Sequence, residues 1–261
     1  MNKNSMFEYN APEGLLNQKI ILVTGASQGI GRAAAKAYAS LGATVLLLSR
    51  SVEQLETLYD EIIAAGYPEP AILPFDLNQA TDESLTSLVN AIDEEYGRLD
   101  GLLNNASVLG FKGMLRDTET LQWTQTMQVN VNATFMLTRD LLPLLEKSPS
   151  ASVVFTSSSV GRKGRAFWGG YAVSKFATEG MMEVFADEMS EISNIRFNCI
   201  NPGGTNTLMR RAAYPGENPN NNPSPEDIMP LYLYLMGNES SQVNGQSLDA
   251  QPKRKTGEAA S

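Results

Sequence analysis

The stretch that decides the fold is ILVTGASQGIGRAAAKAYASL, residues 21–41. Its apolar beginning predicts a buried strand, its glycine-rich middle TGASQGIG (residues 24–31) predicts a tight turn, and its alanine-rich end predicts a helix. A strand, a glycine turn and a helix in this order form the context of a dinucleotide-binding fingerprint. The glycines are spaced GxxxGxG rather than GxGxxG.

Each glycine of this turn has its own steric reason. Gly25 permits the tight turn, Gly29 lets the backbone approach a pyrophosphate, and Gly31 lets the helix and the strand pack closely. The free N–H groups and the partial positive charge at the helix N-terminus attract phosphate. We therefore expect the turn to bind a dinucleotide through Gly25, Ser27, Gln28, Gly29, Ile30 and Gly31.

A second motif, YAVSK, lies in the other half of the chain. It places Tyr171 and Lys175 four residues apart, so both side chains project from one face of a helix. Upstream, Ser158 ends an apolar run that predicts a strand. A phenol whose pKa is lowered by a nearby cation can exchange a proton with a carbonyl or alcohol oxygen.

These motifs occur together in one register. TGASQGIG, Asn104-Asn105-Ala106, Asn130, Ser158, Tyr171-x-x-x-Lys175 and Asn201-Pro202-Gly203 resemble, in order and spacing, the classical short-chain dehydrogenase/reductases over roughly residues 15 to 250. Within that family, TSSSVGR and YAVSKFATEGMM are most similar to the YciK-type oxidoreductases, a bacterial subgroup. The resemblance implies hydride transfer between a nicotinamide dinucleotide and a carbonyl/alcohol pair.

The resemblance also assigns catalytic roles. Ser158, 13 residues before Tyr171, would hydrogen-bond the substrate oxygen, although Ser157 and Ser159 leave the choice of serine open. Strand alternation places Ser158 on the face opposite its two neighbours. Tyr171 would be the general acid/base, and Lys175 would lower its pKa and hold the nicotinamide ribose.

Lowering the pKa of a phenol from about 10 to about 7 requires roughly 4 kcal/mol. An exposed ammonium supplies only about 1 kcal/mol in water. We therefore expect Lys175 to act in a partly desolvated cleft, together with the positive ring of the oxidised cofactor.

Asparagine is a poor residue for the middle of a helix. Asn130 and Asn132 both lie in one predicted helix. The resemblance implies that Asn130 belongs to the catalytic set, where it would anchor a water that links the lysine to solvent. Asn132 is expected at the surface.

Further cofactor contacts follow from the resemblance. The family motif Asn-Asn-Ala-Gly appears with Ser107 in place of glycine, and it would stabilise the strand edge and line the adenine ribose. Asp76 either accepts from the adenine amino group or is a solvated turn acid, and Thr205 competes with Thr207 for the nicotinamide side. The full set is Asn104, Asn105, Ala106, Asp76, Leu77, Tyr171, Lys175, Pro202, Gly203, Thr205 and Thr207.

The end of the second strand bears on the choice between NAD(H) and NADP(H). NAD-binding proteins usually place an acid there to bind the ribose 2′-hydroxyl. Here the run is LLSRS (residues 47–51), and no acid follows until Glu53. Ser49 and Arg50 can instead bind a 2′-phosphate, which favours NADP(H) over NAD(H). The alternative is that Arg50 is a solvated loop cation.

Composition excludes several classes of protein. The chain has 261 residues, 42% of them hydrophobic, and no histidine, so Ser-His-Asp catalysis and histidine metal sites are excluded, and we predict no metal. A net charge of −9 makes nucleic-acid binding improbable. Neither a signal peptide nor an apolar stretch of membrane-spanning length is present, which favours a cytoplasmic protein without membrane partners.

Apolar runs alternate with amphipathic runs along the chain. We predict strands at 19–24, 44–49, 71–75, 101–104, 152–157, 195–200 and 246–250, and helices at 30–41, 52–65, 82–96, 118–147, 166–192 and 226–236. The pattern predicts an α/β fold: one doubly wound Rossmann domain with a parallel seven-stranded sheet and helices on both faces. The resemblance implies the strand order 3-2-1-4-5-6-7.

The domain is expected to cover residues 14–251, between flexible tails at 1–13 and 252–261. Residues 206–225 are rich in proline and asparagine and are predicted to form a long substrate lid. In resembling proteins, the two long helices pair with a second copy of the chain. We therefore expect a homodimer or homotetramer built on Leu121, Phe135, Met181, Met182 and Phe185.

Cations are frequent in the loops expected at the cleft mouth, interleaved with Phe111, Phe167, Trp168 and Tyr214. They are Lys112, Arg116, Arg162, Lys163, Arg165, Arg210 and Arg211. They would form a basic rim for a substrate with an anionic part, or they are solvated charges and intersubunit pairs.

Two alternatives to an NADP(H)-dependent enzyme acting on a small carbonyl or alcohol also remain: a non-catalytic NADP-binding sensor or scaffold, and an NAD-dependent alcohol dehydrogenase of the same fold.

Overall fold

The computed structural model describes residues 7–252, which form one α/β domain around a parallel sheet. Its strands pair in the order β3-β2-β1-β4-β5-β6-β7, which confirms the expected topology. They are β1 (Ile20–Thr24), β2 (Thr44–Ser49), β3 (Ala71–Pro74), β4 (Gly101–Asn104), β5 (Ser152–Thr156), β6 (Arg196–Asn201) and β7 (Gln246–Asp249).

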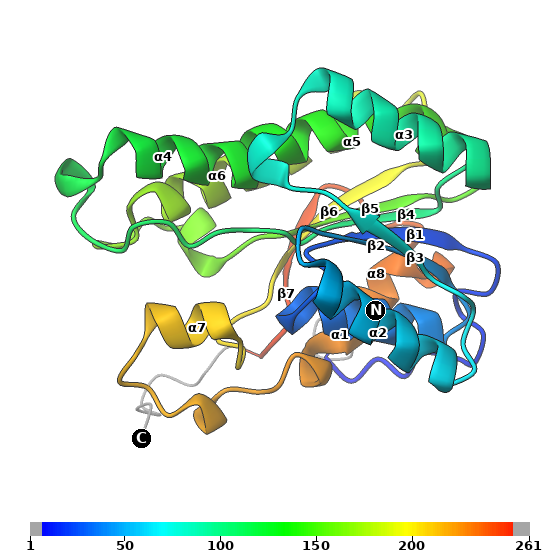
Figure 1. The fold of residues 1–261 in the computed structure, drawn as a ribbon, viewed down its shortest axis with the longest axis horizontal. Helices are drawn as coiled ribbons and strands as arrows, with labels where there is room; N and C mark the ends of the chain where they lie inside the picture. The colour runs from blue at the N-terminus through cyan, green and yellow to red at the C-terminus, as the bar shows by residue number, and fades with distance from the viewer. Residues whose placement is uncertain (1–6, 253–261) are drawn as a thin grey trace.

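Helices cover both faces of the sheet (Figure 1). One layer holds α1 (Gly29–Ser40), α2 (Val52–Ala64) and α8 (Met229–Met236); the other holds α3 (Asp82–Tyr96), α4 (Thr120–Met127), α5 (Ala133–Glu146) and α6 (Gly169–Met189). The short helix α7 (Leu208–Ala213) stands apart from both layers (Figure 1).

Successive side chains along β1 point to opposite faces of the sheet and so belong to two separate core clusters. Ile21 and Val23 pack with Tyr38 of α1 and Tyr232 of α8, whereas Leu22 points to the opposite cluster with α3, α5 and α6. All three β1 side chains are fully buried. A strand that is apolar on both faces can be stable only when helices cover both, which is why a continuous apolar run predicts a parallel sheet.

The two long predicted helices differ from those observed. The helix predicted at 118–147 is interrupted by a π-helical turn at Gln128–Asn132, where the Asn130 side chain bonds a neighbouring loop. The helix predicted at 166–192 begins only at Gly169, because Phe167 has a φ of +70°, outside the helical region.

The lid is more regular than its composition predicts. Residues 208–213 form α7, whose first turn is capped by Thr207, since its hydroxyl accepts from the Arg210 N–H at 3.1 Å. A helical turn follows at Pro219–Asn221. A six-residue helix is too short to show a clear apolar period in the sequence, and the proline and asparagine around it predicted a loop. The helix was therefore not predicted.

The described part of the predicted N-terminal tail contacts the core. Tyr9 is only 7% exposed, and its ring meets the Tyr234 ring of α8 edge to face at 5.4 Å. The rest of that segment, residues 1–6, and residues 253–261 of the predicted C-terminal tail lie outside the described residues.

The residues proposed for an intersubunit face divide into two groups. Leu121 and Phe135 are 65% and 42% exposed, as an interface in an isolated chain requires. Met182 and Phe185 belong to the core, so they contribute to the sheet packing instead. Met181 packs on the core and is partly buried. Assembly as a homodimer or homotetramer stays a prediction.

Candidate active site

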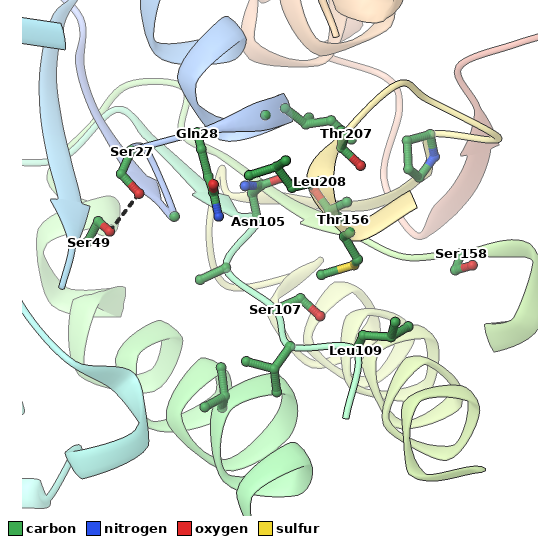
Figure 2. A pocket seen from close by; sticks show the side chains of 18 of the residues that line it. Ser27, Gln28, Ser49, Asn105, Ser107, Leu109, Thr156, Ser158, Thr207 and Leu208 are labelled. Carbon is green, nitrogen blue, oxygen red and sulfur yellow. Dashed lines mark hydrogen bonds between the residues drawn. The ribbon is translucent and has the colours of Figure 1, made fainter. Parts of the chain in front are cut away.

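One cavity of about 330 Å³ runs across the ends of the strands. Its walls come from the turn after β1, the ends of β2, β4, β5 and β6, the start of α6, and α7. Figure 2 shows Ser49 at one side of it and Ser158 at the other. An elongated cavity at this position is where doubly wound sheets bind dinucleotides.

The glycine turn adopts the geometry that its sequence requires. Gly25 has a φ of +67°, and a Cβ there would lie 3.0 Å from the Ala106 Cα. A Cβ on Gly31 would overlap the Gly25 carbonyl, so Gly31 holds the helix against the turn and does not itself line the cavity. The other predicted turn residues do line it: Gly25, Ser27, Gln28, Gly29 and Ile30.

The end of β2 presents hydroxyls and a cation. The Ser49 hydroxyl donates to the Ser27 hydroxyl at 2.9 Å (Figure 2). Arg50 is exposed and lines the cavity, and its side chain makes no hydrogen bond or ion pair with any residue between 7 and 252. A cation without a protein partner beside two hydroxyls fits a phosphate better than a ribose hydroxyl.

Asp76 and Leu77 both line the cavity after β3. The Asp76 carboxylate accepts from the Asn78 N–H at 3.0 Å and caps a short helical turn. Asp76 is therefore a turn acid that also lines the cavity, and its bond to the adenine amino group stays a prediction.

The Asn-Asn-Ala motif divides into one structural residue and two cavity residues. Asn104 is buried, donates to the Thr138 hydroxyl of α5 at 3.0 Å and does not line the cavity, which fits the expected role at the strand edge and gives no support to a direct cofactor contact. The N–H groups of Asn105 and Ala106 both donate to the Thr24 hydroxyl, at 2.9 and 3.0 Å, and both residues line the cavity. The motif thus ties β4 to β1.

Burial and hydrogen bonding distinguish the three serines and favour Ser158. Ser157 is 1% exposed, and its hydroxyl donates to the Glu179 carboxylate. Ser158 follows β5, accepts weakly from the Val160 N–H at 3.4 Å, and presents its hydroxyl to the cavity (Figure 2). Ser159 does not line the cavity.

Tyr171 and Lys175 meet in the same cavity. The Lys175 ammonium lies 5.6 Å from the centre of the Tyr171 ring and donates to the Thr156 carbonyl at 2.7 Å. Burial raises the pKa of Tyr171 to about 12, although a hydrogen bond from Ser158 opposes the rise. Burial lowers the pKa of Lys175 to about 8. The protein groups alone thus do not lower the phenol pKa, so a phenolate at neutral pH needs a further positive charge in the cavity. The expectation that Lys175 acts together with the positive ring of the oxidised cofactor stays a prediction.

Asn130 acts from behind the cavity wall. Its amide accepts from the Val108 N–H at 2.8 Å and donates to the Val108 carbonyl at 2.9 Å and the Ser174 hydroxyl at 3.0 Å. Val108 lines the cavity, whereas Asn130 is 2% exposed and does not. Asn130 therefore joins the β4 loop to the residue before Lys175. Asn132 is exposed, as expected.

The segment after β6, which is predicted to contact the nicotinamide side, lines the cavity. Pro202, Gly203, Thr205 and Thr207 all line the cavity. Thr205 is buried and donates to the Pro202 carbonyl at 3.2 Å, whereas the Thr207 hydroxyl caps α7.

Arg210 and Lys112, two of the seven basic-loop cations, are held by neighbouring groups. Arg210 lines the cavity, but it pairs with Glu217 through two contacts of 2.6 Å and stacks 3.8 Å from the Tyr214 ring centre. Lys112 donates to the Ala213 carbonyl and lies 4.2 Å from the same ring centre. Arg210 and Lys112 thus hold the segment around α7, which favours a structural role for these two cations over anion binding.

Several cavity residues were not predicted from sequence. They are Leu48, Ser51, Phe75, Ser107, Val108, Leu109, Val129, Thr156, Ser157, Leu208, Met209 and Ala213. Many directly follow or end a predicted strand, and that position is the signal that could have found them. The Ser107 hydroxyl is buried and has no partner among residues 7–252, so it is available to a ligand. With the glycine turn and Arg50, it makes the cavity fit a phosphorylated dinucleotide.

The described chain shows neither of two other kinds of site. Over residues 7–252, no helix combines the length and hydropathy needed to cross a bilayer. The same residues bring together no group of three or more His, Cys, Asp or Glu side chains that could hold a metal ion.

Comparison with known proteins agrees with this geometry. A model of the short chain dehydrogenase family matches residues 19–218. The chain is 53% identical over 249 residues to the uncharacterized oxidoreductase YciK of Escherichia coli K12, and the match covers 95% of this chain and 98% of YciK.

Solved structures extend the similarity. A short chain dehydrogenase from Shigella flexneri 2a strain 301, complexed with NADP, has a TM-score of 0.90 at 53% identity and covers 92% of this chain and 100% of that one. A short chain dehydrogenase from Escherichia coli CFT073, complexed with NADPH, has a TM-score of 0.90 at 54% identity over 92% and 100% of the two chains. The chain therefore belongs to the short-chain dehydrogenase family, with YciK among its near relatives.

Proposed function

We propose that this protein is an NADP(H)-dependent oxidoreductase that interconverts a carbonyl and an alcohol, with Tyr171 as general acid/base. One observation carries the proposal. The same cavity that begins at the glycine turn and Arg50 ends at Ser158, Tyr171 and Lys175. Cofactor-binding groups and proton-transfer groups thus face one space.

NADP(H), when bound, supplies or accepts the hydride. In reduction, the Tyr171 hydroxyl gives its proton to the carbonyl oxygen, and in oxidation the phenolate takes a proton from the alcohol. The Ser158 hydroxyl donates a hydrogen bond to that oxygen as negative charge develops. The Lys175 ammonium stabilises the phenolate by its charge and would hold the ribose hydroxyls.

Arg50 supports the choice of NADP(H) over NAD(H). It is exposed at the end of β2, without a protein partner among residues 7–252, beside the paired hydroxyls of Ser49 and Ser27. The proteins complexed with NADP and NADPH that share more than half of this sequence also support it.

The walls around Tyr171 favour an uncharged substrate. Leu109, Trp168 and Met209 pack around Tyr171 in a small apolar cluster, and the Trp168 ring centre lies 5.7 Å from that of Tyr171. Arg210 is neutralised by Glu217. These apolar side chains favour an apolar carbonyl compound. The Lys175 ammonium also lies beside Tyr171, but it donates to the Thr156 carbonyl and is reserved in this proposal for the phenolate and the ribose hydroxyls.

Oxidation of NADPH with a panel of uncharged ketones and aldehydes, followed at the nicotinamide absorbance, tests the proposal. Tyr171→Phe keeps the ring and removes the proton donor, so turnover should fall by about 10²–10⁴-fold while NADPH still binds. Near wild-type turnover by this variant would contradict the mechanism. NADPH binding without turnover of any substrate would favour a sensor, and equal use of NADH would favour the NAD-dependent alternative. A cytoplasmic location stays a prediction.

A further inference from the structure

A buried carboxylate lies behind the catalytic groups, outside the cavity that they line. Glu179 follows Lys175 by one turn of α6 and is 8% exposed. Its carboxylate accepts from the Ser157 hydroxyl and lies 3.4 Å from the Arg162 Nε. Because a buried charge is costly unless it is paired and hydrogen-bonded, this arrangement requires all three side chains together.

Arg162 is itself anchored on the last strand. It pairs with Asp249 at 2.7 Å and donates to the Ser247 hydroxyl at 2.9 Å. Asp249 also accepts from the Asn201 amide at 2.8 Å, and Asn201 accepts from the Gly203 N–H at 3.2 Å. A continuous chain of polar contacts thus connects Glu179 with the cofactor-side loop after β6.

Glu179 also acts on Lys175 through space. Burial lowers the pKa of Lys175, while Cys199 of β6 and Glu179 of α6 act in the opposite direction. Burial raises the pKa of the Cys199 thiol well above its usual value, so this thiol is neutral in the working range. Tyr171 faces Lys175 as a neutral phenol, and Arg162 lies beyond Glu179. Glu179, one turn of α6 from Lys175, is therefore the carboxylate whose charge raises the pKa of Lys175 against the effect of burial.

We propose that Glu179 is a positioning residue for the hydride-transfer site, an inference that rests on the proposed function. Through Ser157 it holds the strand end that carries Ser158. Through its charge it maintains Lys175 as an ammonium. It touches neither substrate nor cofactor, since it does not line the cavity.

The test is the pH dependence of NADPH-linked carbonyl reduction by three variants. Glu179→Gln keeps size and hydrogen bonding but removes the charge. Glu179→Asp keeps the charge. Glu183→Gln removes an exposed carboxylate one turn further along α6 and serves as the control.

The direction follows from the role of the charge. Lys175 works as a cation, and loss of a neighbouring anion lowers its pKa below about 8. The ratio of the Glu179→Gln kcat/KM to the wild-type kcat/KM should be nearest to one at low pH, where Lys175 is protonated in both proteins. As pH rises the ratio should fall, by about tenfold if the pKa of Lys175 is lowered by one unit. Glu179→Asp and Glu183→Gln should keep the wild-type profile shape.

Two results would overturn the inference. A Glu179→Gln profile that is parallel to wild type at every pH would show only a structural role, and an equal shift in Glu179→Asp would show that charge is not the cause. NADPH affinity, measured by nicotinamide fluorescence against pH, needs no turnover. If the wild type turns over no carbonyl, the proposed function fails. NADPH affinity must still weaken with rising pH more in Glu179→Gln than in wild type. An NADPH affinity profile that is the same in both proteins would refute the role of Glu179.

Discussion

The glycine turn and the lid line the same cavity, but different interactions hold them. In the turn, the backbone of Gly25 and Gly31 packs so closely that no side chain fits between. In the lid, α7 is held by side-chain contacts: Lys112, from a distant loop, donates to the Ala213 carbonyl, and Arg210 of α7 pairs with Glu217. The comparison teaches that one wall of the site is set by local backbone geometry and the other by replaceable long-range contacts.

The largest effect should come from breaking the turn. A Cβ added in Gly31→Ala would overlap the Gly25 carbonyl and lie 2.6 Å from the Asn105 amide nitrogen, so the turn must move. Losing two charged phosphate hydrogen bonds, at about 1.5–3 kcal/mol each, should weaken NADPH binding by roughly 100-fold or more. Fluorescence titration measures it, and NADH should weaken equally.

Gly180→Ala is the matched control, because a Cβ on this α6 residue meets no atom within 4 Å. It should bind NADPH as wild type does. Intact binding by Gly31→Ala would show that the turn tolerates side chains and that its packing does not decide cofactor affinity.

A smaller effect, confined to one cofactor, is expected at the end of β2. Arg50→Ala should weaken NADPH binding by about 1–3 kcal/mol, the value of a lost charged hydrogen bond, and leave NADH nearly unchanged. Dissociation constants for both cofactors decide the matter. Equal weakening of the two would mean that Arg50 does not contact the 2′-phosphate.

A smaller effect again should follow from loosening the lid. Lys112→Met removes the bond to the Ala213 carbonyl and the cation over the Trp168 and Tyr214 rings. Since such contacts contribute about 0.5–1.5 kcal/mol each, the KM for a ketone should rise by roughly 2–10-fold while NADPH affinity is unchanged. Lys163→Met, at an exposed loop position, is the control. If Lys112→Met changed the NADPH affinity and left the KM for the ketone unchanged, Lys112 would act on cofactor binding and not on substrate binding.

The smallest effect concerns substrate charge. For matched neutral and anionic ketones, the ratio of kcat/KM should change by less than about twofold between low and high salt, because the lid cations are already paired. An anionic ketone that is preferred at low salt and loses its advantage at high salt would show that these cations steer substrate.

The strands and the glycine turn could be predicted because their determinants are local. The apolar run before Thr24 specifies burial on both faces, and the backbone of the turn needs residues without a Cβ. Asn104 was predicted at a strand end and Asn130 within a helix, but the protein groups that they contact could not be predicted. Their partners, Thr138 for one and Val108 and Ser174 for the other, are brought near only by folding.

The sequence by itself determined the doubly wound fold, the dinucleotide turn and the grouping of Ser158, Tyr171 and Lys175, because each depends on periodicity, on glycine geometry or on a fixed spacing. Only the tertiary structure decided which serine hydroxyl is bonded to Glu179, that residues 208–213 form a helix, and that Lys112 and Arg210 are held by neighbouring groups. It also raised the pKa of Tyr171 to about 12 and lowered that of Lys175 to about 8. These properties depend on burial and on distant partners, which no local pattern encodes.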